Sequence, residues 1–431
     1  MTDLALPRSG LGAGGRPVKP SRISATARVM AATGAVIALA AGCGAVVGGS
    51  AVKAGGPAPA AADPALLDPG NYPRRARPPL GAVPNEDAGR VVEAQRMADA
   101  VVGPWEVDRT LVTGQVEHAS IGVLPTLDSL AGDLAPGMIA QARAHHFLLG
   151  FVSGRATPAP APGQSAGVKA KILVNMVLRF ATPEDAAAAA GEMAATNRGI
   201  PRDGVPATEL KIPRYPTTVA NMAAVHQGFE AESFTAHGTY VFHEYAGSKE
   251  SADAVADLIA KSLDLQGPAI DHFQATPADQ LAALPADPTG LLARTVPSTK
   301  PDPNHAAVYQ PHAALHFSPD PPAAQGVFND AGVQRMSADL TSVYDAVDAP
   351  GAQRGADGLV RINASWGSYK PTAGISGLPS ARCFDRGPGG QLLPRFMCVA
   401  TVDHYAFKAT ATQELDLHQV MAAQYLMLTA S

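Results

Sequence analysis

Three scarcities limit what this 431-residue chain can be. Aromatic residues make up only 5% of the sequence, which disfavours a dense aromatic core or a surface that stacks bases. Charged residues make up 16%, yet no stretch beyond position 45 is long and apolar enough to cross a bilayer, which excludes a polytopic membrane protein. The net charge is −5, and the one basic cluster, Arg74, Arg75 and Arg77, is typical of a solvated loop. We therefore expect no nucleic-acid partner.

The N-terminus has the pattern of an export signal. Basic residues precede the uncharged run Val29–Ala41, which is too short for a spanning helix but suits a signal peptide. The run ends at Ala40-Ala41-Gly42-Cys43, which resembles the lipobox of bacterial lipoproteins, where an acylated cysteine becomes the first residue. We expect a signal peptide over 1–42 and a lipid anchor at Cys43 on the extracytoplasmic side of the cell membrane. Ala40 stands at position −3 where Leu is commoner, so simple secretion or an uncleaved anchor stays open.

With Cys43 lipidated, two of the three cysteines remain, Cys383 and Cys398. An even number in an oxidising, exported setting favours a disulfide. The residues between them include a Gly- and Pro-rich turn, so the bridge would join the two arms of a hairpin. A metal pair or a catalytic thiol is the alternative, and neither a CxxC spacing nor a nearby ligand cluster supports it.

Composition divides the rest of the chain into segments. Residues 43–65 are rich in Gly, Ala and Pro and predict a flexible tether, and 285–304 predicts a Pro-rich linker. We expect an N-terminal domain over 66–284, with a flexible loop at 156–167, and a C-terminal domain over 305–431.

Strand-like runs and helical stripes occur in both domains. The order strand, helix, strand, strand, helix predicts an α+β class, with helices on one face of an antiparallel sheet in each domain. Thr182-Pro183 predicts the start of an Ala-rich helix after the strand Ile172–Phe180. The other expected elements that matter below are a strand at Thr235–Tyr245, a strand at Ala307–Phe317, a helix at Pro321–Val347, a strand at Leu359–Ser365 and a helix at Glu414–Leu428.

Two short matches indicate an internal repeat. Tyr240-Val241-Phe242-His243 aligns with Tyr405-Ala406-Phe407-Lys408, and each precedes an expected helix. A weaker match pairs Phe180-Ala181-Thr182-Pro183 with Phe317-Ser318-Pro319. The sequence leaves open whether these are a structural repeat or chance.

Several segments together resemble a family of exported two-domain lipoproteins of actinobacteria, of the mycobacterial and nocardial type, that has no assigned activity. They are Leu67-Asp68-Pro69-Gly70-Asn71-Tyr72-Pro73, Pro78-Pro79-Leu80-Gly81, Glu93-Ala94-Gln95-Arg96-Met97-Ala98 and Val102-Gly103-Pro104-Trp105. The resemblance implies envelope attachment through lipid at Cys43. It supplies no catalytic residues.

Catalytic and phosphate-binding motifs are not supported. Gly163-Gln164-Ser165-Ala166-Gly167 matches G-x-S-x-G, but a Pro/Ala loop precedes it and a strand follows, whereas a nucleophile elbow needs a strand and then a helix. Neither GxGxxG nor GxxxxGK[ST] occurs in a strand–helix setting. We predict no catalytic residue from these patterns.

Metal-ligand patterns are equally weak. Two histidine pairs have spacings that would place both rings on one strand face, and three carboxylates fall in one expected helix. Neither pair has a third ligand at a suitable spacing, and a solvated helix face explains the carboxylates, so we predict no metal and no cofactor. The residues are His237 with His243, His312 with His316, and Asp339, Asp345 and Asp348.

The function that we expect is binding rather than catalysis. The hypothesis is an envelope lipoprotein that captures a partner protein or an apolar envelope molecule. A hydrolase with an unrecognised site and a structural subunit of an envelope complex are the alternatives. A pocket lined mainly by apolar groups would favour binding, and converging Ser, His and carboxylate side chains would favour an enzyme.

Overall fold

A computed structural model describes residues 61–114, 120–159, 170–226, 228–300, 302–388 and 394–430. They belong to one compact unit, Ala58–Ser431. The predicted signal peptide, Cys43, Gly163–Gly167 and most of the predicted tether and loop lie outside the described residues. Within the described ranges, no helix is both long enough and apolar enough to cross a membrane.

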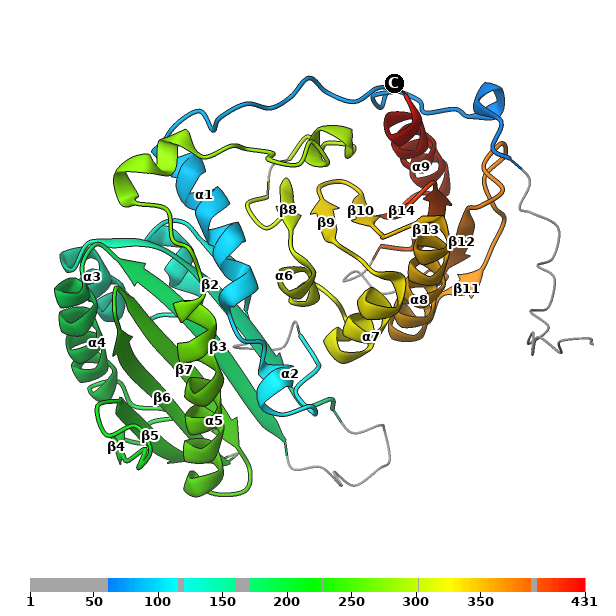
Figure 1. The fold of residues 1–431 in the computed structure, drawn as a ribbon. Helices are drawn as coiled ribbons and strands as arrows, with labels where there is room; N and C mark the ends of the chain where they lie inside the picture. Colours follow the sequence, from blue (N-terminus) through cyan, green and yellow to red (C-terminus); the bar gives the residue numbers. More distant parts are fainter. Residues whose placement is uncertain are drawn as a thin grey trace, which may run out of the picture. The chain divides into compact units, whose positions relative to one another are not determined.

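Two antiparallel sheets of seven strands each organise the described residues and confirm the α+β class (Figure 1). The first sheet contains β1 Ile121–Leu124, β2 Phe147–Ala156, β3 Lys171–Phe180, β4 Thr208–Leu210, β5 Val219–Val225, β6 Gly228–His237 and β7 Tyr240–Ser248. The second contains β8 Ala307–Tyr309, β9 Arg335–Ala338, β10 Ser342–Asp345, β11 Lys370–Pro371, β12 Arg382–Asp385, β13 Phe396–Val402 and β14 Tyr405–Ala411.

The two sheets have the same topology. The first has the order β1-β2-β3-β7-β6-β5-β4, and the second, read from its β8 edge, has the order β8-β9-β10-β14-β13-β12-β11. Each strand of the second sheet therefore takes the place of the strand seven positions earlier. The match of Tyr240 with Tyr405 is part of this repeat, because these residues begin β7 and β14. The match of Phe180 with Phe317 is wrong, since β3 ends at Phe180 and its counterpart β10 ends at Asp345.

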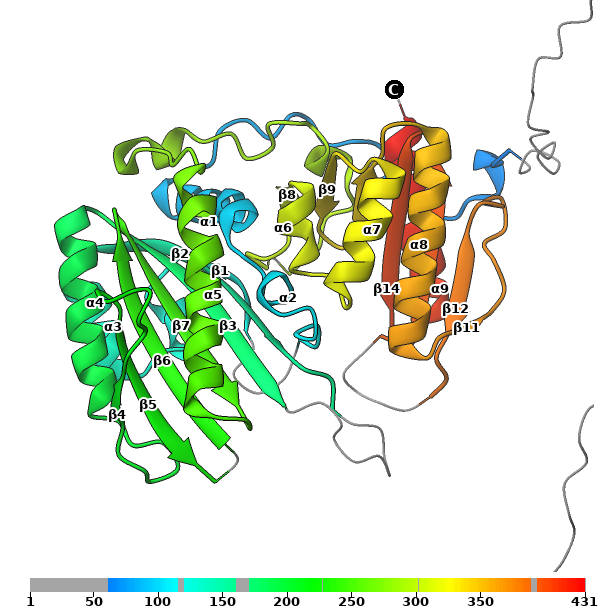
Figure 2. The ribbon, with the colours of Figure 1, turned by 60° about the horizontal axis from the view of Figure 1, so that its bottom comes forward.

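Helices cover both faces of each sheet, rather than the single face that we expected (Figures 1 and 2). In the first sheet α3 and α4 lie on one face, and α1 and α5 on the other. In the second sheet α6, α7 and α8 lie on one face, and α9 on the other. The helices are α1 Glu86–Met97, α2 Pro104–Val107, α3 Pro136–Ala144, α4 Pro183–Arg198, α5 Ala252–Asp271, α6 Pro311–Leu315, α7 Pro321–Ala331, α8 Ala349–Gly367 and α9 Glu414–Thr429.

The helices α4 and α8 occupy equivalent places and begin in the same way. Thr182 caps α4 by accepting a hydrogen bond from Asp185 N, as expected from the sequence. Asp348 caps α8 by accepting one from Gly351 N. The repeat therefore extends to the helix that follows the third strand of each sheet.

Four sequence-based element assignments are wrong. The stretch Thr235–Tyr245 spans a hairpin, because Gly238 turns the chain with φ +55° between β6 and β7. The stretch Pro321–Val347 is not one helix, because Gly332 ends α7 in a left-handed conformation with φ 63°, and the β9–β10 hairpin follows. Ala307–Phe317 is a short strand and then α6, which Pro311 begins, and Leu359–Ser365 lies inside α8.

The segment before α1 lies on the C-terminal half (Figure 1). Tyr72 Oη donates to Asp416 Oδ1 of α9 over 2.7 Å, and Asp63 N donates to Gly377 O over 2.9 Å. The predicted linker is packed as well, since Val296 is fully buried and its N–H donates to Gln424 of α9. Asp63, Tyr72 and Val296 thus pack against the second domain.

The two halves also share one hydrophobic cluster. His316, fully buried after α6, packs edge-on against Trp105 and close to Phe151, with ring centroids 5.1 and 5.0 Å away. Its Nδ1 lies 2.8 Å from Ser153 Oγ and its Nε2 lies 3.1 Å from Ala98 O. Burial lowers the pKa of His316 well below its ordinary value, so this ring is a neutral core histidine.

Candidate functional site

A cavity of about 360 Å³ lies between the second sheet and the helices on its α8 face. Its volume is within the range of small-molecule sites, and its lining is divided about evenly between apolar and polar groups. The apolar lining includes Phe317, Phe328, Met336, Tyr344, Leu359 and Ile362. The polar side chains around it include Lys408, Asn363, Asp339, His305 and Ser298.

Lys408 reaches this cavity because of the alternation along β14. Its neighbours Phe407 and Ala409 are buried with α9 on the other face of the sheet, so Lys408 points to the α8 face. Its register partners are Ser342 in β10 and Val399 in β13. The lysine thus stands in the middle of the sheet, half-buried, rather than at an edge.

Few groups compensate the positive charge of the Lys408 ammonium group. Nζ donates to Asn363 Oδ1 over 3.3 Å, and no carboxylate among the described residues forms an ion pair with it. Burial lowers the pKa of Lys408 to about 8. Asn363 is held in place by its own Nδ2, which donates to Leu359 O over 2.8 Å, so its amide oxygen is left for Lys408.

A second pocket of about 320 Å³ lies on the α4 face of the first sheet. Met138, Val174 and Met176 line its apolar part. His243 lines it too, at the place in β7 that Lys408 takes in β14, as the aligned tyrosines Tyr240 and Tyr405 show. The two pockets are therefore related by the repeat.

The charges of this N-terminal pocket are paired internally. Glu232 of β6 lies 2.9 Å from His243 Nε2 and 3.1 Å from Arg202 Nη2. Burial alone would raise the pKa of Glu232, but hydrogen bonding to His243 and the positive charges of His243 and Arg202 hold it at about 2. Asn197 also donates to this carboxylate and so helps to lower its pKa.

Two family models match the chain. The N-terminal model of a domain of unknown function, DUF7373, matches residues 80–286, and the C-terminal model matches residues 291–431. The chain belongs to the DUF7373 family. Each of the two sheets lies within one of the matched ranges.

Other comparisons add little to the DUF7373 assignment. The extracellular domain of PknH from Mycobacterium tuberculosis aligns at 11% identity, with 40% of this chain and 94% of that chain covered and a TM-score of 0.26. At that TM-score, we draw no inference from the likeness. No curated protein matches the chain significantly.

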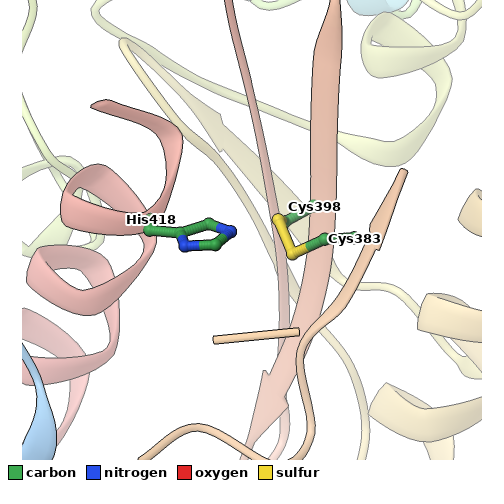
Figure 3. A group of neighbouring side chains, drawn as sticks. All are labelled: Cys383, Cys398 and His418. Atoms are coloured by element: carbon green, nitrogen blue, oxygen red, sulfur yellow. A yellow bond between two sulfur atoms is a disulfide. The ribbon is translucent and has the colours of Figure 1, made fainter. Parts of the chain in front are cut away.

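The two cysteines of this DUF7373 protein lie opposite each other in β12 and β13. The structure joins them in a disulfide between these neighbouring strands, with the Cα atoms 4.1 Å apart. Figure 3 shows the His418 ring of α9 directed toward this disulfide. The two sulfurs and a ring nitrogen lie within 4.8 Å of one another, but bonded sulfurs are not the thiolates that bind a metal. The disulfide lies on the α9 face, across the sheet from the cavity.

The histidine pairs that we considered from the sequence do not share a strand face. His237 and His243 stand on different strands, and His237 Nε2 lies 2.7 Å from Asp271 rather than near His243. His312 belongs to α6, where its Nε2 lies 3.0 Å from Glu106, and His316 lies buried between the two halves. Each of these rings has a partner within the protein.

The rings of His312 and His316 lie with their centroids 5.5 Å apart, whereas the three carboxylates are dispersed, because the expected helix does not exist. Asp345 ends β10 and Asp348 caps α8. Asp339 is in the β9–β10 turn, where it accepts a hydrogen bond from Ser298 N over 2.8 Å and where burial raises its pKa. Asp339 alone of the three lines the cavity.

The sequence indicated in part that Lys408 belongs to a site. The aligned motifs place His243 and Lys408 at one position of the repeat, but the match predicts only a repeat and no pocket. Asn363 was hidden, because its segment reads as a strand. It follows its helix cap, Asp348, by as many residues as Asn197 follows Thr182.

Proposed function

We propose that this protein is an exported lipoprotein, acylated at Cys43, whose folded part binds an apolar or amphipathic molecule of the cell envelope without catalysis. The export signal and the lipobox-like Cys43 support the anchor. The cavity on the α8 face carries the binding role, because its volume suits a small molecule and its lining combines aromatic and aliphatic side chains with polar groups, as an amphipathic molecule requires.

The polar groups of the cavity support binding more than hydrolysis. Ser298 and His305 both line it, but Ser298 Oγ hydrogen-bonds the backbone of Lys300, and His305 Nδ1 lies 3.5 Å from Asp302. A nucleophilic serine needs a base within hydrogen-bond reach. Within the part of the chain that the structure describes, the lining holds no such serine–histidine bond.

The test is intact-mass spectrometry of the protein extracted from its own membranes, together with the molecules that co-purify. We expect the mass of residues 43–431 plus acyl groups, and a retained apolar molecule. A chain without acyl groups would overturn the anchor.

Two variants connect a retained molecule with the cavity. Ser342 lies in the cavity floor beside Lys408, so Ser342→Phe fills the space, whereas Ser342→Ala leaves it open. We expect the molecule to remain with Ser342→Ala and to be lost with Ser342→Phe, while both variants keep the wild-type circular dichroism. Equal retention by the two variants, or an acylated wild-type chain with nothing bound, would overturn the binding role of this cavity.

A further inference from the structure

The repeat shows what is missing beside Lys408. In the first sheet the basic residue of β7, His243, contacts the carboxylate of Glu232 in β6. Glu232 is the register partner of Tyr245, and the residue at the place of Tyr245 in β14 is Thr410. The register partner of Thr410 is Met397. A buried methionine therefore takes the place of the carboxylate.

Other parts of the site are kept. Asn197 of α4 and Asn363 of α8 stand at the same distance along the chain from their helix caps. Asn197 contributes a hydrogen bond to Glu232, and Asn363 accepts one from Lys408. The second domain thus retains the basic group and the amide but lacks the acid.

An ammonium group has three donors, and the amide of Asn363 uses one of them. Lys408 is half-buried, and a charge that loses part of its water is stabilised by a partner of opposite charge. Met397 is 1% exposed and its thioether does not neutralise a cation.

We propose that the cavity binds an amphipathic carboxylic acid, with the carboxylate against Lys408 and the apolar body along the aromatic and aliphatic lining. This deepens the proposed function and rests on it. The ligand supplies the carboxylate that Glu232 supplies in the first domain.

Asp339 favours one orientation of the bound acid in the cavity. Its carboxylate lies in the β9–β10 turn, whereas Lys408 lies on β14 and is separated from β9 by β10. A ligand carboxylate is attracted by Lys408 and repelled by Asp339. The acid group therefore lies at the β14 side of the cavity.

The first experiment compares decanoate with decanol by isothermal titration. The chain from residue 43 onward with Cys43→Ser keeps the whole compact unit Ala58–Ser431. We expect decanoate to bind at least about tenfold more tightly than decanol, as one charge-assisted hydrogen bond allows. Lys408→Met removes this preference and keeps the affinity for decanol, whereas Lys408→Arg keeps the preference.

A second pair of variants places the missing acid in the protein. Met397→Glu provides an internal carboxylate and should remove the preference for decanoate, and Met397→Gln, of similar size but neutral, should retain it. Circular dichroism checks that both variants fold. If Met397→Glu does not fold, the comparison of Lys408→Met with wild type decides alone.

The outcomes separate this inference from the proposed function. If neither decanoate nor decanol binds, the proposed binding function fails. If both bind equally, or if Lys408→Met keeps the preference, the cavity binds apolar molecules but the carboxylic acid is wrong. An equal gain with decyl phosphate would overturn the carboxylate in favour of any anion.

Discussion

The two pockets of this protein occupy equivalent places in the repeat but differ in their charges. The charged groups of the first pocket pair with one another, whereas the lysine of the second has no charged partner among the described residues. In the first domain Glu232, His243 and Arg202 form a buried cluster that compensates its own charges. In the second, Lys408 has only the amide of Asn363 within hydrogen-bond reach among the described residues. A buried charge in a repeat protein is therefore best judged against its counterpart, because the counterpart shows which partner that position can hold.

The largest expected effect comes from making the first pocket like the second. Glu232→Met leaves His243 and Arg202 without their carboxylate, so we expect a loss of about 3–5 kcal/mol in the free energy of unfolding. Urea denaturation followed by circular dichroism measures it. Glu209→Met is the control, because Glu209 pairs with Lys211 at the surface and should change little. Equal stability of Glu232→Met and wild type would show that the carboxylate of Glu232 does not stabilise this cluster.

Removing the disulfide should have the next largest effect. Cys398 stands at the place of Ser233 in β6, and Cys383 at that of Ala220 in β5, so only the second sheet has a covalent link here. Replacing both cysteines by alanine should lower the free energy of unfolding by about 3 kcal/mol. Wild-type protein in a reductant should reach the same midpoint as the double variant. An unchanged midpoint in both would show that the link adds no stability.

Glu244 gives the first domain a pH dependence that the residue at the same place in the second domain, Ala409, cannot give. Burial raises the pKa of Glu244 to about 8, with a hydrogen bond from Ser233 only partly opposing it, and its counterpart in β14 is Ala409. In the unfolded chain Glu244 ionises near the ordinary pKa of a glutamate, whereas in the folded chain it stays protonated up to about pH 8. The free energy of unfolding therefore falls as the pH rises between these two pKa values. Between pH 5 and pH 7 the fall is about 2 to 3 kcal/mol for one proton.

Glu244→Gln is the matched variant for this titration. It keeps the shape and stays neutral, so it should remove this fall in stability between pH 5 and pH 7. Thermal unfolding at several pH values measures both chains. Parallel curves for wild type and variant would show that Glu244 is already ionised when folded.

The smallest expected effect is at Lys408. Lys408→Met removes a half-buried charge without a counter-charge, so the unliganded protein should become more stable at pH 7, by about 1 kcal/mol. His243→Met in the first pocket should do the opposite, because Glu232 then loses a partner. Chemical denaturation of the two variants measures the difference in sign. A marked loss of stability with Lys408→Met would mean that the lysine is structural.

The sequence predicted those parts of the fold that depend on local signals. Thr182 and Pro183 mark the start of α4, and the cysteine arms form a hairpin. The β9–β10 hairpin was missed because its residues continue a helical pattern from α7, and pairing of β10 with β14 decides their structure. That pairing joins residues far apart in the sequence, which periodicity does not detect.

The site was less predictable than the fold, for the same reason. Lys408 was visible as the partner of His243 in the aligned motifs, whereas the absence of an acid beside it depends on the register of β13 with β14. Asn363 contributes only because α8 covers that face of the sheet. No local pattern contains these contacts.

In a chain anchored at Cys43, as we propose, the segment that precedes α1 determines which domain first takes up a force from the membrane. Asp63, near the end of the predicted tether, and Tyr72, which follows it, are hydrogen-bonded to the second domain. Under the proposed anchor, a pull from the membrane is therefore borne first by the contacts with Gly377 and α9 of the second domain. The domain that holds the cavity is thus the one that the chain reaches first after the proposed anchor.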